Sequence, residues 1–183
     1  MERQESQPAA GGARVAGAGK YLTFRLGEEE YGLEILKVRE LIGLMEITPV
    51  PMTPEYIRGV INLRGKVIPV VDLRLKFGLQ PTPDNDRKTI IVVDVKKPKG
   101  LVQMGVLVDL VSEVAFIAAD DIEAPPSFGD DYATSFILGM GKSKGVLKVL
   151  LDIDVVLGSS DVISAAVHAP AQPNANAAAS SLQ

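Results

Sequence analysis

Short stretches of alternating apolar and polar residues, and short runs of β-branched residues, recur along this 183-residue chain. Alternation places side chains on opposite faces of an extended strand, and turn-forming residues separate one stretch from the next. A series of about nine or ten short strands with frequent turns is typical of sandwiches and small barrels. The clearest predicted strands span residues 21–26, 30–33, 60–63, 67–73, 89–95, 102–108, 110–117, 136–140 and 146–153.

Two of the predicted strands contain stretches, 67–71 and 90–93, that are apolar throughout and lack a polar face. A strand of that kind is covered on both of its faces. Two small barrels that pack together through these strands, and that exchange a terminal strand, would account for the pattern. The polar, proline-broken loop at 80–88 is the expected split between them. Pro69 has no backbone N–H to donate, which predicts an edge strand or a bulge.

Two segments that precede the predicted strand at 60–63 carry helix signals. Thr53 can cap a helix, Pro54 suits the first helical position and Gly59 can end it, so one or two helical turns are predicted there. In residues 34–43 the apolar positions fall three and four apart. That spacing predicts a short amphipathic helix or a crossover that ends at Gly43.

A tight connection, Arg64-Gly65-Lys66, joins the strands at 60–63 and 67–73, because Gly65 can adopt a positive φ at no steric cost. Arg64 therefore lies near the tip of a hairpin whose strands are otherwise apolar. Arginine is one of the residues in which the binding energy of protein interfaces concentrates. The hairpin tip is thus predicted to bind another protein.

Composition limits the classes of protein to which the chain can belong. With 46% hydrophobic residues it can bury one full core or two small cores that share an interface. With only 5% aromatic residues, Val, Ile and Leu must fill that interior. A net charge of −4 gives no basic field for nucleic acid or anionic membranes. No uncharged apolar run of about 18 residues exists, so we expect a soluble, cytoplasmic protein without membrane insertion.

The two ends of the chain differ in composition from its middle. Residues 1–19 lack hydrophobic periodicity, and Ala, Pro, Asn and Ser dominate the chain from His168 onward. Such segments bury too little apolar surface to offset the entropy lost on ordering. We therefore expect a disordered N-terminal segment over 1–19, a folded domain over 20–158 and a flexible tail over 159–183.

Candidate catalytic and metal-binding residues are few. The chain has no cysteine, and its one histidine, His168, sits in the alanine-rich tail with no neighbour to orient it. Four aspartates each follow two apolar residues and in principle allow an acid/base pair or a magnesium site. No phosphate loop or spaced ligand set accompanies them, so each is expected to bond a turn amide or an arginine such as Arg74, and no cofactor or metal is expected. These aspartates are Asp72, Asp94, Asp109 and Asp152.

Motifs along most of the chain resemble those of the CheW-like family of bacterial chemotaxis coupling proteins. The resemblance covers residues 20–158, and its most specific segment is Asn62-Leu63-Arg64-Gly65. It implies an all-β fold of two five-stranded SH3-like barrels around a shared aliphatic core, with short helices. It also implies a scaffold, without catalysis or cofactor, that links the cytoplasmic tips of chemoreceptors to the histidine kinase CheA. The matching segments are 31–40, 49–51, 59–65, 68–74, 105–109, 111–114 and 150–152.

Carried over position by position, the resemblance implies which residues meet the receptor tip. They are Arg64, Asn62, Val38 and Glu40, with Val111 and Val114 on the facing side of the same groove. The three valines fit core packing equally well, and Glu40 fits a solvated charge or a salt bridge. Kinase surfaces are expected at the outer ends of the barrels, and other copies of the coupler are candidate partners. A CheW-like regulatory module of another pathway and a small-ligand-binding β-barrel remain alternatives.

Overall fold

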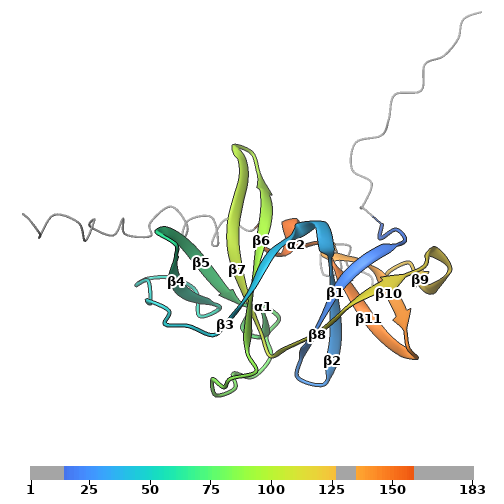
Figure 1. Cartoon of the computed structure of the whole chain (residues 1–183), viewed down its shortest axis with the longest axis horizontal. Coiled ribbons are helices and arrows are strands. Elements are labelled where there is room, and N and C mark those ends of the chain that lie inside the picture. Colours follow the sequence, from blue (N-terminus) through green and yellow to red (C-terminus); the bar gives the residue numbers. More distant parts are fainter. Residues whose placement is uncertain (1–14, 127–134, 159–183) are drawn as a thin grey trace, which may run out of the picture.

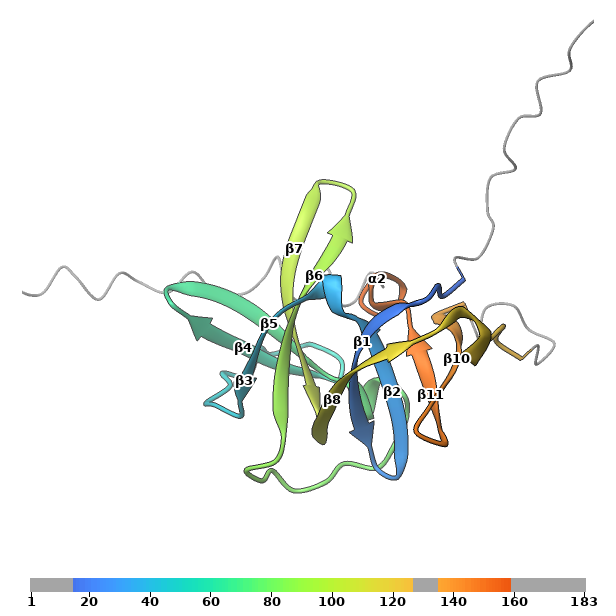
Figure 2. The same ribbon diagram turned by 45° about the vertical axis from the view of Figure 1, so that its right-hand side comes forward.

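The structure, a computed structural model, describes residues 15–126 and 135–158. Within these residues eleven strands form two sheets that lie side by side (Figures 1 and 2). The strands are β1 (Gly19–Leu26), β2 (Glu29–Glu34), β3 (Val38–Gly43), β4 (Ile57–Leu63), β5 (Lys66–Asp72), β6 (Thr89–Lys97), β7 (Gly100–Val108), β8 (Leu110–Ile117), β9 (Ile122–Glu123), β10 (Ile137–Ser143) and β11 (Val146–Leu151). Short helical segments connect them: η1 (Ile35–Lys37), α1 (Leu73–Lys76), η2 (Ala119–Asp121) and α2 (Ile153–Val156).

The order of strands shows how the chain divides between the sheets. One sheet runs β3-β6-β7-β5-β4, and the other runs β8-β1-β2-β11-β10-β9, of which β9 is only two residues long. The first hairpin of the chain belongs with its last strands, because β2 pairs in parallel with β11. The chain passes between the sheets at 35–37 and at 109, whereas the loop at 80–88 stays within the five-stranded sheet. The prediction of an all-β fold of two small SH3-like barrels is confirmed.

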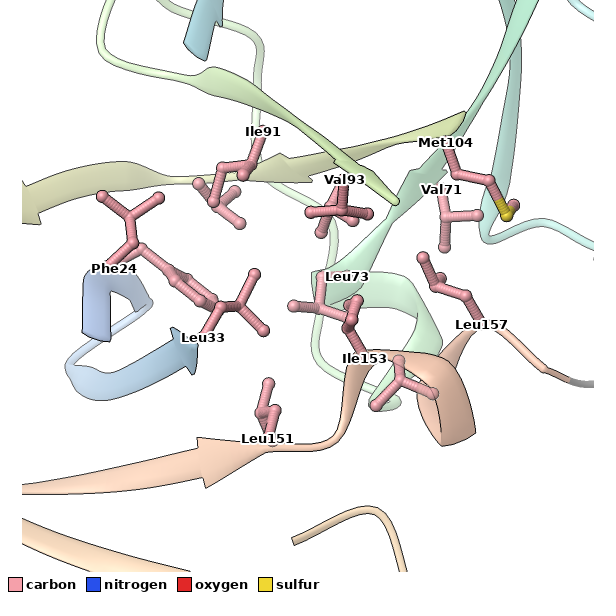
Figure 3. Close-up of a cluster of buried hydrophobic side chains, with 14 of the residues drawn as sticks. Phe24, Leu33, Val71, Leu73, Ile91, Val93, Met104, Leu151, Ile153 and Leu157 are labelled. Carbon is pink, nitrogen blue, oxygen red and sulfur yellow. The ribbon is translucent and has the colours of Figure 1, made fainter. Parts of the chain in front are cut away.

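The largest buried cluster draws on both sheets (Figure 3). Strand β6 joins it through Ile91, Val93 and Val95, whereas Ile90 and Val92 enter a separate core within the five-stranded sheet. Successive residues of a strand point to opposite faces, so β6 is covered on both faces and needs no polar side. The joint cluster also contains Phe24, Leu33, Val71, Leu73, Met104, Leu151, Ile153 and Leu157.

The helix predicted to start at Thr53 is wrong. The backbone makes a single turn there, in which the Ile57 N–H donates to the carbonyl oxygen of Pro54 (3.0 Å), and β4 begins at Ile57. The Thr53 hydroxyl caps no helix, since it donates to the carbonyl oxygen of Val50 (2.8 Å). The local signals were sound for a helix start, but pairing of the chain with β5 extends it instead.

The helix predicted over 34–43 is limited to the three residues of η1, which form the crossover between the sheets. Residues 38–43 form β3, where half-buried and exposed positions alternate and the backbone pairs with β6. Of the edge strand or bulge predicted from Pro69, the edge position is wrong, because β5 lies between β7 and β4. The β4–β5 pairing does shift register next to Pro69, between the pairs Gly59–Val70 and Ile57–Val71. The described pairing with β7 begins one residue later, at Val70, so the missing N–H of Pro69 interrupts no ladder bond there.

Gly59 gives a test of this register. It has a φ of 138°, and a Cβ at this position would lie 2.0 Å from the carbonyl oxygen of Thr48, which bridges to Val60. Gly59→Ala should therefore destabilise the protein by more than about 3 kcal/mol. Gly43→Ala is the matched control, because a Cβ there meets no atom within 4 Å. Equal urea midpoints for the two variants would contradict the described path of the chain.

Candidate functional site

Arg64 stands at the tip of a stiff hairpin. Leu63 pairs with Lys66, so Arg64 and Gly65 form a two-residue turn in which both have positive φ, 52° and 81°. This backbone, the type I′ turn, matches the twist of the flanking strands. The side-chain oxygen of Asn62 accepts a hydrogen bond from the Gly65 N–H (2.8 Å) and braces the turn from one side. The turn holds Arg64 outward, with 73% of its side chain exposed.

The guanidinium of Arg64 already has a partner within the chain. Both of its terminal nitrogens donate to the carboxylate of Glu40 on β3, and the Nη1–Oε2 distance is 3.3 Å. These hydrogen bonds raise the pKa of Arg64 above its ordinary value. The salt bridge considered for Glu40 therefore exists and ends on Arg64, whereas neighbouring Arg39 pairs with Asp94. Arg64, Glu40 and Asn62 thus belong to one cluster.

The second barrel repeats this arrangement with other residues. Lys144 and Gly145 form the turn between β10 and β11 with positive φ at both, 52° and 74°. Lys144 pairs with Glu113 of β8 (2.7 Å), just as Arg64 pairs with Glu40 of β3. This contact lowers the pKa of Glu113. Each barrel therefore joins a cationic hairpin turn to an acidic residue on an edge strand.

The three candidate valines lie on edge strands that flank the junction between the sheets (Figures 1 and 2). Val38 on β3 and Val111 on β8 are half-buried and pack against the joint cluster, so core packing explains much of their burial. Val114 is 49% exposed. It pairs with Leu22, and paired residues project from the same face of a sheet. Val111 and Val114 belong to the six-stranded sheet, whereas the Arg64 cluster belongs to the five-stranded one.

Sequence reasoning missed one exposed apolar residue beside Val114. Phe116 on β8 is 66% exposed, while its neighbours Ala115 and Ile117 are buried. Strand β8 therefore presents apolar side chains on both faces, outward as well as toward the core. The available signal in the sequence was the unbroken apolar run at 114–117, which does not by itself say which face of the strand meets water.

Two of the four candidate aspartates cap short helices at equivalent places in the two barrels. Asp72 accepts a hydrogen bond from the N–H of Leu75 at the start of α1 (3.3 Å). Asp152 accepts from the N–H groups of Asp154 (3.1 Å) and Val155 (3.3 Å) at the start of α2. Such a carboxylate satisfies amide donors that the first helical turn leaves without partners.

The other two aspartates pair with arginines. Asp109 accepts from Nη1 of Arg74 (2.6 Å) and from the N–H of Gly27 (2.7 Å), and Asp94 accepts from Nε of Arg39. The prediction that these aspartates bond turn amides or arginines is confirmed.

In the described part of the chain no group of three or more His, Cys, Asp or Glu is placed to hold a metal. His168 lies outside the described residues. No helix among residues 15–126 and 135–158 is long and apolar enough to cross a bilayer.

The paired small barrels, with charged turns and apolar residues on their edge strands, define a β-rich module of two SH3-like domains. The family model of the CheW-like domain matches residues 20–161. The chain belongs to the CheW-like domain family.

Individual relatives agree with this assignment. The chemotaxis protein CheW of Klebsiella aerogenes is 37% identical over 143 residues, which are 78% of this chain and 84% of that protein. The chemotaxis protein CheW of Rhizobium meliloti is 35% identical, over 79% of this chain and 91% of that protein. The crystal structure of the scaffolding protein TtCheW from Thermoanaerobacter tengcongensis is 35% identical, with a TM-score of 0.69, and covers 79% of this chain and 95% of that one.

The capping role of Asp152 can be separated from a role for its charge. Asp152→Ala removes the acceptor for two amides and should lower the free energy of unfolding by about 1 kcal/mol. Asp152→Asn keeps an acceptor oxygen, and asparagine caps helices about as well as aspartate. It should therefore retain most of the stability in urea denaturation. If Asp152→Asn is as unstable as Asp152→Ala, the cap does not explain this residue.

Proposed function

We propose that this protein is a non-enzymatic, cytoplasmic scaffold that couples the cytoplasmic tips of chemoreceptors to the histidine kinase CheA. Membership of the CheW-like family supports the proposal, as do relatives named as chemotaxis and scaffolding proteins. The aspartates that sequence reasoning weighed for catalysis are engaged in helix caps and ion pairs, which favours binding over chemistry.

The observation that carries the proposal is the fixed presentation of the Arg64 guanidinium. An arginine has five N–H donors, and Glu40 engages only the two terminal nitrogens. Donors therefore remain for a carboxylate or carbonyl of a receptor tip without loss of the internal pair. Glu40, with 30% of its side chain exposed, acts as the positioning residue, and Asn62 stiffens the turn. Little side-chain entropy is then lost when a partner binds.

The edge strands supply the apolar part of the proposed receptor contact. Val114 is exposed on β8, and Val38 and Val111 line the junction between the sheets with their half-buried side chains. An amphipathic helical tip laid along this junction would bury these valines while its polar side meets Arg64. The kinase would bind at the outer ends of the barrels, where other copies of the coupler are also candidate partners.

Truncation of Arg64 tests the proposal. Arg64→Ala should weaken binding to receptor-containing membranes at least about 30-fold, as expected for an arginine central to an interface. It should also abolish receptor-dependent phosphorylation by CheA. Because the side chain is exposed, the Tm should stay within about 2 °C of the parent.

Arg87→Ala is the matched control, since Arg87 is an exposed arginine on the 80–88 loop and not in the turn between β4 and β5. It should leave co-sedimentation and kinase activation unchanged. An Arg64→Ala variant that folds normally and still couples receptor to kinase at the parent level would refute the site assignment.

A further inference from the structure

The hairpin of β6 and β7 projects beyond the other strands (Figures 1 and 2). The end of this hairpin that carries its turn is held against α2, because the Lys96 N–H donates to a carboxylate oxygen of Asp154 (2.7 Å). The Lys97 ammonium likewise donates to the carbonyl oxygen of Leu157 (2.6 Å). The projecting strands are therefore held in place close to their turn.

A pocket of about 530 Å³ opens beside this hairpin. It lies where the start of β1, the η1 turn and the β6–β7 strands meet, and it shares no residue with the Arg64 cluster. Its lining includes Lys20, Ile35, Leu36, Asp94 and Leu101.

Two large apolar side chains stand out at this pocket. Leu36 is 94% exposed and Leu101 is 65% exposed, although both line the same hollow. Neighbouring Ile35 packs against the joint core, which fixes η1 and turns Leu36 outward. Exposed apolar residues that converge on a pocket, rather than being scattered singly, are typical of an interaction site.

The β6–β7 hairpin adds positive charge beside the pocket, although the chain as a whole has a net charge of −4. Lys20 lines the pocket, and Lys96 pairs with Leu101 across the hairpin and so lies on the same face. Lys99 lies at the hairpin turn. The lining itself is balanced, with Lys20 and Lys37 against Glu34 and Asp94. Lys37 pairs with Asp154 and Asp94 pairs with Arg39, so the surplus positive charge comes from Lys96 and Lys99 of the hairpin.

We propose that this pocket and the β6–β7 hairpin bind an acidic amphipathic helix of a partner protein. The apolar side of such a helix would bury Leu36 and Leu101, and its carboxylates would face Lys20, Lys96 and Lys99. A hollow beside a projecting hairpin accepts inserted side chains, whereas a flat bilayer surface would meet the hairpin first. The shape therefore favours a protein segment over an anionic membrane.

The test uses the full chain labelled with ¹⁵N and three probes. The first is a designed helical peptide of about 18 residues, long enough to be helical in water, with leucines on one side and glutamates on the other. The second carries lysine in place of each glutamate. The third is a vesicle of phosphatidylserine and phosphatidylcholine. We expect the glutamate peptide alone to shift amide signals of residues 35–37, 96–97 and 99–101, with an affinity that falls as salt rises.

Variants locate the contact. The double variant Leu36→Ser, Leu101→Ser should weaken binding of the glutamate peptide at least about 10-fold. The double variant Lys96→Glu, Lys99→Glu should weaken that binding to the same extent. Met52→Ser is the matched control, because Met52 is fully exposed and lies outside the pocket. If the leucine variant does not fold, as judged by loss of a dispersed spectrum, the binding measured for the lysine variant tests the proposal. The proposal is overturned if the glutamate peptide does not bind, if the lysine peptide binds equally well, or if only the vesicles bind. It is also overturned if the signal shifts fall elsewhere in the chain, or if a folded variant binds the glutamate peptide with unchanged affinity.

Discussion

Burial of strand β6 on both faces is the constraint on which the rest of this structure depends. Alternate residues of β6 enter the core of one barrel and the cluster shared by both, so neither barrel can complete its interior without the other. The β2–β11 pairing ties the two ends of the folded chain into one sheet. The edge strand β3, which carries Glu40 and Val38, pairs with β6. The shared core therefore also positions the candidate site.

The hairpin turns of the two barrels share one arrangement of backbone and charge. Arg64-Gly65 and Lys144-Gly145 have the same backbone, and each cation meets a glutamate on the neighbouring edge strand. Asp72 and Asp152 likewise end equivalent strands and cap equivalent helices. The charges that invite a catalytic interpretation thus hold turns and helix ends in place. The two turns differ in their cation, and recognition of a partner is proposed for the turn with the guanidinium fork of Arg64.

Local patterns predicted the strands, the hairpins and the position of Arg64, because alternation and turn chemistry depend on neighbouring residues. They failed where distant pairing decides. Residues 38–43 have helical spacing of apolar positions, yet β6 offers them a partner and they become β3. Gly59 suggests a helix end, but its lack of a Cβ allows the carbonyl group of Thr48 to approach closely. The Arg64–Glu40 pair joins a turn residue to a residue of strand β3, and no spacing in the sequence predicts this contact.

A charge swap at the Arg64–Glu40 pair tests the central claim, that Arg64 binds a partner rather than only bracing its own barrel. In a variant with Glu40→Arg and Arg64→Glu the internal ion pair can reform, but the cation moves from the exposed turn to β3. We expect the stability of the swapped protein to match that of the parent, while receptor-dependent phosphorylation by CheA is lost. Full recovery of that phosphorylation in the swapped protein would show that the pair acts only within the fold.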